Sequence, residues 1–359
     1  MNHAADSLER SGRAHSLLFV FPWAKLGLWM VITAAVSVIA LAKGSVDIPP
    51  GAVLGILLDK TLGISVAYPK SAGWEPIIWD IRVPRVLLAG LIGGALGLSG
   101  ATYQGIFRNP LADPYLLGIA GGAGLAATII LLAPIPVSLY SLSILPLFAF
   151  GGALASAFIA YLLAKVGRTV PMTTLILAGV AIAALTSAMT SFLMMASRED
   201  IRVIFAWLLG GFATGSWSKL PWVLIYLLPS AVFILLHGRI LNVMQLDEEQ
   251  ATQLGVRVER TKLLLLGAAS LATAAAVSVS GLIGFVGLVI PHIVRLLGGV
   301  DHRLLLPGSA VLGAGFLVLA DLLARTVIGP AEMPVGIVTA FCGAPFFLYL
   351  LRQRKRAIF

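Results

Sequence analysis

The chain has 359 residues, of which 59% are hydrophobic and 11% charged, and its mean hydropathy is +0.98. An average soluble domain is about 45–50% apolar and about 25% charged, so this composition excludes a water-soluble protein and requires a lipid bilayer. The single cysteine, Cys342, excludes an internal disulfide framework and a cysteine-built metal site. A net charge of +9 would suggest nucleic acid in a soluble protein, but no nucleic-acid partner is expected here, because the placement of the charges matters more than their sum.

Ten stretches are apolar and long enough to be membrane helices, which need about 20 residues each. The sixth contains a break at three glycines, and the seventh and eighth run together near Gly281. The fold class predicted is therefore an all-α, polytopic membrane protein. The stretches are 25–42, 84–107, 115–133, 144–165, 172–196, 203–213 continuing into 221–237, 262–280, 282–298, 304–326 and 334–352.

The distribution of basic residues orients these spans. With both termini in the cytoplasm, sixteen Lys and Arg residues fall on the inner side and nine on the outer side. This agrees with the positive-inside rule. We expect a cytoplasmic segment 1–24, one membrane domain 25–352 and a basic cytoplasmic tail 353–359. The run Ala40-Leu-Ala42 resembles a signal-peptidase site, but the first helix is expected to be retained because the apolar run and the segment before it are long.

The longest loop, 43–83, lies on the outer side in this orientation and ends at Ile81-Arg-Val-Pro-Arg85. Arg82 and Arg85 stand on the side that disfavours cations. One interpretation is simple helix-flanking charge. The other is an external anionic partner that these arginines bind.

Two inner loops carry local signals. Asp113 and Pro114 predict a helix start, because Asp is a good N-cap and Pro suits the first helical position. The loop 239–262 is the most charged part of the chain. Asp247, with Gln250 three residues later, predicts a cap, and Gly255 predicts a stop.

A short helix at about 248–254 is therefore expected within the loop 239–262. Its apolar residues Leu246, Ala251 and Leu254 fall on one face at helical spacing. Docking onto a cytosolic partner is one use for such a helix. A solvated loop resting on lipid headgroups is the other.

Within the spans, pairs of glycines four residues apart predict close helix packing. They are Gly90 with Gly94, Gly93 with Gly97, and Gly118 with Gly122. Ionisable residues are few, and Asp321 and Arg325, four apart, are expected to neutralise each other. Hydroxyl groups on span five and polar groups on span two either bond within the protein or together line a pathway.

Several chemistries have no motif in this chain. There is no G-x-x-x-x-G-K-[ST] phosphate loop, so the chain is not expected to hydrolyse ATP itself or to bind a cofactor. There is no H-E-x-x-H, and the histidines are scattered, so no metal site is expected. An intramembrane enzyme is correspondingly weakly supported.

A series of short motifs runs along the membrane domain, beginning with the run from Arg82 to Pro114 and with Leu117-Gly118 and Gly121-Gly-Ala123. Further motifs follow in order: Leu177-Ala-Gly-Val180, Trp207-Leu-Leu-Gly210, Gly284 to His292, Asp301-His-Arg303, Leu306-Pro-Gly308, Ala320 to Arg325, Gly336 to Ala340 and Gly343-Ala-Pro345. In these motifs and their order, over about 25–352, the sequence resembles the iron–siderophore, haem and vitamin B12 permease family of ABC importers.

This resemblance implies a type II ABC importer permease fold with ten helices. It implies a homodimer in a bacterial or archaeal cytoplasmic membrane, with two ATP-binding subunits inside and one extracytoplasmic substrate-binding protein outside. ATP and Mg²⁺ would be bound by the partner ATPase. The cargo implied is a large metal chelate, namely an iron–siderophore, haem or cobalamin complex, which the chain would translocate by alternating access.

The resemblance also implies roles for residues. Arg82, Arg85 and Arg325 correspond to arginines that dock the binding protein. The loop around 246–256 corresponds to the segment that couples to the ATPase, with Leu246, Asp247, Glu248, Glu249, Ala251, Leu254 and Gly255 as its residues. Met172, Thr173 and Thr174 correspond to the inner gate, although Met172 departs from the small polar residue expected there.

An ion-coupled secondary transporter of a small solute is the alternative function. It predicts ionisable groups at an intramembrane coupling site, and the sequence offers few.

Overall fold

A computed structural model describes residues 22–44, 46–64, 73–133, 144–167, 169–197, 201–328 and 331–356. The helices in these ranges are α2 (Pro22–Ala42), α3 (Pro50–Leu62), α4 (Trp74–Pro76), the π-helical η2 (Ile77–Arg82), α5 (Val83–Phe107), the 3₁₀-helical η3 (Pro114–Leu117), α6 (Ile119–Leu132), α8 (Ile144–Ala164), α9 (Met172–Ala196), α10 (Ile201–Leu208), α11 (Lys219–Leu236), α12 (Gly238–Val243), α13 (Glu248–Gln253), α14 (Val258–Ser280), α15 (Val286–Gly298), α16 (His302–Thr326) and α17 (Val335–Arg356).

The predicted all-α membrane fold is confirmed. Seven helices in the described ranges are long and apolar enough to cross a bilayer, and α6, α15 and Val335–Tyr349 in α17 form three shorter apolar helices. Each of the ten predicted stretches overlaps one of these ten helices. The residues 1–21 and 357–359, which hold most of the predicted N-terminal segment and the last part of the tail, lie outside the described residues. The rest of the predicted tail continues α17 to Arg356.

Two span boundaries differ from the prediction. Asp113 does act as an N-cap, but it caps η3 rather than span three, and Gly118 in the left-handed region (φ +76°) separates η3 from α6. The stretch predicted as the start of span six is a separate helix, α10. Gly210 (φ +68°) follows this helix, and α11 alone forms the span. Positive φ favours glycine and interrupts a helix, which is why both boundaries lie at glycines. Gly281 (φ +70°) ends α14 close to the predicted boundary.

The loop 43–83, predicted to lie on the outer side, contains helices that the hydropathy pattern does not predict. α3 forms within it, and α4 and η2 continue without interruption into α5. Trp79 of η2 stacks on Trp217 with ring centroids 5.0 Å apart, and the Trp217 Nε1 donates to the Trp79 carbonyl at 2.9 Å. This contact ties the outer end of α5 to the loop that precedes α11.

α5 is the central helix of the bundle, and most of its residues are buried. Its closest neighbour is α16, and the predicted glycine packing explains the proximity. A side chain at Gly93 would collide with the carbonyl of Gly313, and one at Gly97 with the carbonyl of Ser309. The two backbones therefore meet directly, as small residues allow in a membrane.

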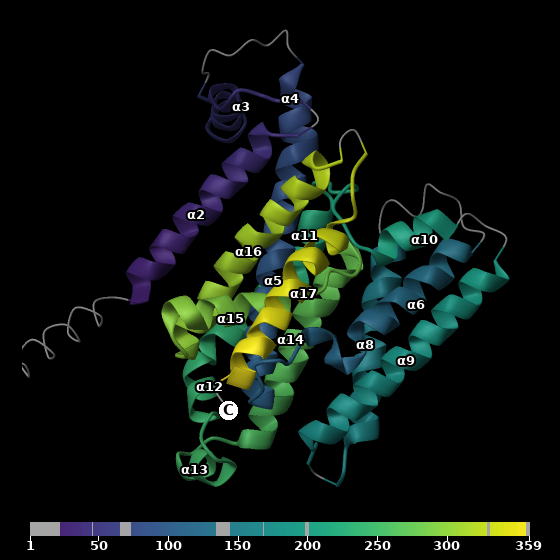
Figure 1. The fold of residues 1–359 in the computed structure, drawn as a ribbon, viewed down its shortest axis with the longest axis vertical. Helices are drawn as coiled ribbons and strands as arrows, with labels where there is room; N and C mark the ends of the chain where they lie inside the picture. The colour runs from purple at the N-terminus through teal and green to yellow at the C-terminus, as the bar shows by residue number, and fades with distance from the viewer. Residues whose placement is uncertain are drawn as a thin grey trace, which may run out of the picture.

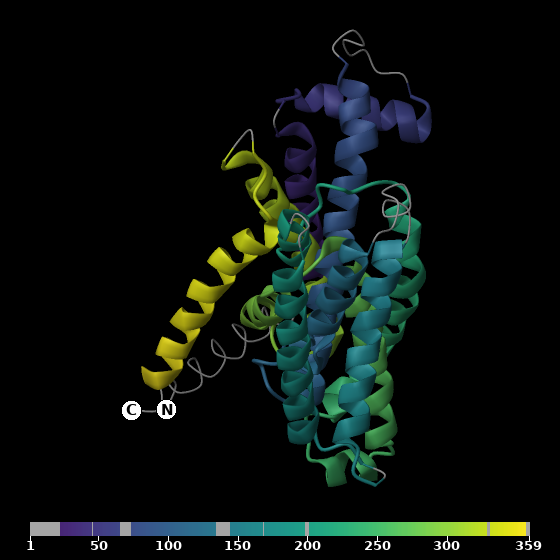
Figure 2. The ribbon, with the colours of Figure 1, turned by 90° about the vertical axis from the view of Figure 1, so that its right-hand side faces the viewer.

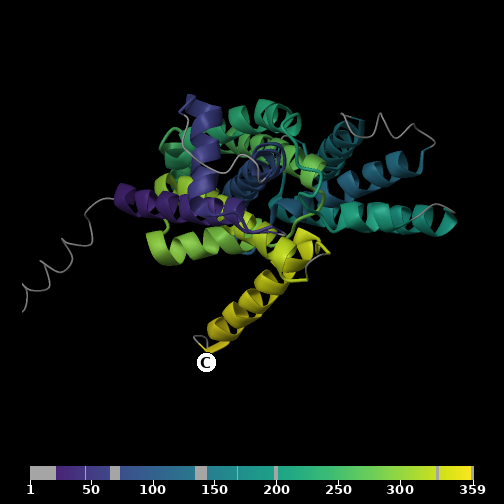
Figure 3. The same cartoon turned by 90° about the horizontal axis from the view of Figure 1, so that it is seen from above.

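The remaining helices are arranged around this centre. α2 packs on α16, while α11 and α14 flank α5, and α6, α8, α9 and α10 form a second group to one side (Figure 1). α17 slants away from the rest of the bundle (Figures 2 and 3). α3 lies at one end of the molecule and α13 at the other, so the two predicted interaction sites are at opposite ends (Figure 1).

Candidate functional site

The first candidate site is a buried network of charges near α3, where α5 begins and α16 ends. The Arg85 Nε donates to both carboxylate oxygens of Asp321 at 3.0 and 3.1 Å, and its Nη2 donates to one of them at 2.9 Å. Arg325 Nε lies 3.1 Å from the other Asp321 oxygen. The expected pairing of Asp321 with Arg325 is confirmed, but the same carboxylate also binds Arg85.

Glu332 completes this network from the loop before α17. Its carboxylate accepts from the Arg85 Nη1 at 3.0 Å, and its side chain is 43% exposed, whereas those of Arg85 and Asp321 are 7% and 1% exposed. Glu332 was not singled out from the sequence. It stands 247 residues from Arg85, and only the fold brings the two together.

Arg82 and Arg325 also close the end of α2. Arg82 donates to the carbonyls of Leu41 and Ala42 at 2.7 and 3.1 Å, and Arg325 donates to the carbonyl of Ala40 at 3.1 Å. The last carbonyls of a helix lack partners within the helix, and cations there are favourable. The three predicted docking arginines are thus brought together, with buried guanidinium groups that bind the chain's own oxygens.

A cavity of about 730 Å³ adjoins this network. It is lined by Arg85, Lys219 and Glu332 and by residues of α10, α14 and the loops before α11 and α17. The Lys219 ammonium donates to the Thr214 hydroxyl at 2.7 Å. The cavity therefore has two cations, one carboxylate and several hydroxyl residues on a wall that is otherwise apolar.

The second candidate site is α13 in the loop at the opposite end. Asp247 occupies the N-cap position in extended conformation but makes no side-chain cap bond, and Gly255 (φ +84°) ends the helix as predicted. The predicted single apolar face is wrong in one respect. Ala251 is fully buried against its own chain, while Leu246 and Leu254 are 42% and 63% exposed. The exposed surface of α13 and its flanks therefore includes these leucines and the acidic Asp247, Glu248 and Glu249, beside the polar Gln250, Thr252 and Gln253.

Lys262 fastens α13 to α14. Its ammonium lies 2.5 Å from a Glu248 carboxylate oxygen and 3.2 Å from one of Glu259. The hydrogen bond from Lys262 holds the pKa of Glu248 below its usual value. The Lys262 side chain is 8% exposed, and a buried ammonium group requires such partners. Because the Glu248 pKa is lowered, the stability that the ion pair contributes is lost only as the pH falls through that lowered pKa.

The loop before α13 is attached to the inner ends of two spans. Arg108, in the left-handed region at the end of α5, donates to the Met244 carbonyl at 2.7 Å, and Gln245 donates to the Gly105 carbonyl at 3.0 Å. Asn242 donates to Asp301, the N-cap of α16, at 2.7 Å. A displacement of α13 would therefore act directly on α5 and α16, the two most closely packed helices.

The predicted gate residues form the first turn of α9, after Pro171 at the N-cap. Thr173 is exposed, and Met172 and Thr174 are half-buried. Further along α9, the hydroxyls of Thr186 and Thr190 donate to carbonyls of their own helix at 2.8 and 2.9 Å. The polar groups of span two are buried and bonded within the protein, so they do not line a passage in this structure.

Asp113 gives a pH-dependent expectation at the inner hairpin. Its carboxylate accepts from the Tyr115 backbone N–H at 2.8 Å, and burial raises the pKa of Asp113 to about 6. A raised carboxyl pKa means that stability present below pH 3.8 is lost as the pH rises through about 6. Asp113→Asn keeps the cap without the charge. As the pH rises from 3.8 through about 6, the melting temperature of this variant relative to that of the wild type should rise, and it should remain higher at pH 8. The measurement is differential scanning fluorimetry. A difference in melting temperature that is equal at every pH would contradict a raised pKa for Asp113.

Comparisons with known proteins identify the family of this chain. The FecCD transport family matches residues 32–353. The chain is 46% identical over 287 residues to the cobalamin import system permease protein BtuC of Halobacterium salinarum, covering 80% of this chain and 76% of the relative. It is 46% identical over 294 residues to the hemin transport system permease protein HmuU of Yersinia pestis, covering 80% and 86%.

A solved structure shares the fold. It is a metal-chelate type ABC transporter in an inward-facing conformation, with a TM-score of 0.77 and 32% sequence identity over 93% of this chain and 100% of the other. The family match spans nearly the whole membrane domain and includes both candidate sites. This chain therefore belongs to the FecCD transport family, whose relatives found here are permeases of ABC importers.

Proposed function

We propose that the chain is the membrane permease subunit of a binding-protein-dependent ABC importer for a large metal chelate. The family match over residues 32–353 carries this proposal. The named relatives transport cobalamin and hemin, and the similar structure is of metal-chelate type. The proposed cargo is accordingly an iron–siderophore, haem or cobalamin complex.

The partners proposed are two ATP-binding subunits, one extracytoplasmic binding protein and a second copy of this chain. ATP and Mg²⁺ belong to the ATP-binding subunits. The exposed acidic and aliphatic surface of α13 supports the first contact. α17 supports the homodimer, because it slants away from the bundle and leaves side chains such as Phe341 75% exposed (Figure 2). The membrane proposed is a bacterial or archaeal cytoplasmic membrane, with both termini inside.

The proposed mechanism is alternating access. Closure of the ATP-binding pair moves α13, and the bonds of Arg108, Gln245 and Asn242 transmit this motion to α5 and α16. The first turn of α9, with Met172, Thr173 and Thr174, is proposed as the inner gate. Hydrolysis by the partner resets the spans.

Docking of the binding protein is proposed to use Arg85 by exchange of carboxylates. Glu332 is half-exposed and occupies one Arg85 donor, so a carboxylate of the binding protein can replace it while Asp321 keeps the other donors. Arg82 and Arg325 are proposed to hold the surrounding helix ends in place.

Glu332→Gln tests this exchange. Removal of the competing negative charge should tighten binding of the cognate binding protein about threefold to tenfold at low ionic strength, with the gain reduced at high salt. The measurement is biolayer interferometry on the permease in nanodiscs. The matched control is Asp47→Asn, an exposed outer carboxylate paired with Lys43. Equal affinities for wild type and Glu332→Gln would place docking elsewhere.

Uptake by reconstituted vesicles tests the function. The permease, with its ATP-binding and binding-protein partners, should accumulate a labelled chelate only when ATP is supplied. Cobalamin, haem and a ferric siderophore offered separately identify the cargo. Uptake driven by an ion gradient without ATP would instead support the secondary transporter, which the pairing of Asp321 with two arginines does not favour.

A further inference from the structure

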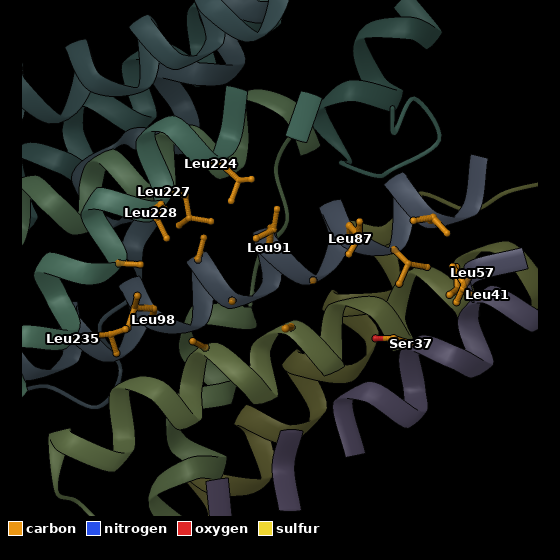
Figure 4. Close-up of a pocket in the computed structure, with 18 residues that line it drawn as sticks. Ser37, Leu41, Leu57, Leu87, Leu91, Leu98, Leu224, Leu227, Leu228 and Leu235 are labelled. Carbon is orange, nitrogen blue, oxygen red and sulfur yellow. The ribbon is translucent and has the colours of Figure 1, made fainter. Parts of the chain in front are cut away.

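A long apolar groove runs beside α5 and has no role in the proposed transport cycle. Its volume is about 590 Å³. α5 and α16 form its floor, α11 one wall, and α2 with Leu57 of α3 the other wall and one end (Figure 4). Four small residues, Gly90, Gly94, Ala310 and Ala314, make the floor deep.

The lining offers nothing to a polar ligand. Ser37 carries the only polar side chain among the lining residues, and its hydroxyl donates to the Thr33 carbonyl at 2.9 Å within its own helix. A dry apolar cavity of this kind does not hold ordered water. An empty groove would also forfeit the dispersion contacts of every side chain along it.

The shape of the groove fits a linear hydrocarbon. It follows α5 from Val83 to Leu98, which is about 22 Å at 1.5 Å per residue, against a bilayer hydrocarbon thickness of about 30 Å. Leu41 and Leu57 lie at one end and Leu98 and Leu235 at the other (Figure 4). The groove therefore extends along the membrane normal, with α3 at its outer end.

The groove opens sideways onto surface that faces lipid. On its rim, Leu87 is 46% exposed and Leu228 59%. The outward faces of α2 and α11 are also aliphatic, with Val31 66% and Ile225 63% exposed. An acyl chain of the lipid that covers this surface can therefore enter the groove from the side without crossing a polar barrier.

We propose that the groove binds one acyl chain of a membrane phospholipid, which enters from the leaflet on the α3 side. The chain would fill the space between α11 and α2. An acyl chain in the groove would set the distance between α11 and α2. Because α11 leads through α12 to α13, this distance would affect how α11 moves when α13 is displaced. The inference does not depend on the identity of the cargo or on transport.

Photolabelling tests the proposal with the full-length permease in vesicles of phosphatidylethanolamine and phosphatidylglycerol. A trace phospholipid carries a diazirine on its acyl chain, and the labelled peptides are mapped by mass spectrometry after a detergent wash before irradiation. The expected label is on 83–98 of α5 and 224–235 of α11 and persists through the wash. Label spread equally over the exposed faces of α8 and α9 would overturn the proposal.

Two variants fill the groove from opposite sides. A β-carbon at Gly90 has only ordinary contacts, the nearest at 3.9 Å, so Gly90→Phe directs a ring into the groove, and Ala231→Phe does so from α11. Either should abolish most of the retained label. Gly151→Phe, at an exposed span position with open surroundings, should not. Undiminished label in a folded groove variant would overturn the proposal. Disulfide cross-linking between two copies that carry Leu228→Cys would also overturn it and would assign the groove to a second copy.

Discussion

Asp321→Asn is expected to be the most destabilising single substitution at the outer end of the bundle. The Asp321 carboxylate is 1% exposed and binds both Arg85 and Arg325. Its neutralisation leaves two buried guanidinium groups close together, with the half-exposed Glu332 as the remaining carboxylate of the network. Removal of one partner from a buried ion pair typically costs about 3–5 kcal/mol, because the remaining charge is uncompensated. The melting temperature of the detergent-purified permease should fall accordingly.

A double-mutant cycle separates this electrostatic effect from a local packing defect. Arg85→Gln, Asp321→Asn and the double variant should show strong coupling, with the double variant more stable than the sum of the single effects predicts. Asp47→Asn serves as the control, since the Lys43–Asp47 pair is on the surface and such pairs contribute little. Additive effects in the cycle would show that Arg85 and Asp321 have no coupling energy.

Ala251→Pro is expected to uncouple the permease from its ATPase. The Ala251 N–H donates to the Asp247 carbonyl at 2.9 Å, and the Ala251 side chain is fully buried. Proline removes this bond and collides with that carbonyl, at a typical cost of about 3 kcal/mol inside a helix. A helix of six residues cannot absorb this cost, so α13 should lose its shape. Co-purification of the ATP-binding subunits and ATP-driven uptake should both be lost.

Val53→Pro provides a matched control at the other end of the molecule. Val53 occupies the equivalent position in α3, with its N–H bonded to the Pro49 carbonyl at 3.2 Å and its side chain fully buried. This variant should retain the ATP-binding subunits. If Ala251→Pro also retained them, the loop 239–262 would have a different role.

Local signals in the sequence were sufficient where structure depends on neighbouring residues. Hydropathy predicted each of the ten apolar helices, since a bilayer demands continuous apolar runs. Gly255 predicted the end of α13, and Gly93 and Gly97 predicted close helix packing, which the structure places against α16. The motifs in their order also indicated the family, which the match to residues 32–353 confirms.

Other features were missed because no periodicity marked them. α3 lies crosswise at one end of the molecule, in the stretch that the hydropathy pattern predicts as a loop (Figure 2). Helical spacing places Ala251 on one apolar face with Leu246 and Leu254, but the packing of α13 on its own chain buries Ala251 alone. Helical spacing alone defines a face but does not say which neighbour covers it.

The sequence by itself determined that this chain is a membrane protein, where its ten apolar helices run and to which family it belongs, because each of these is encoded in hydropathy or in short motifs. Only the tertiary structure decided that Arg85, Asp321, Arg325 and Glu332 form one network and that a groove remains beside α5. The physical reason is that partners for a buried charge, and gaps between packed helices, depend on residues far apart in the sequence, up to 285 positions for Arg325 and Ala40. Such distances are set by packing, which no local pattern records.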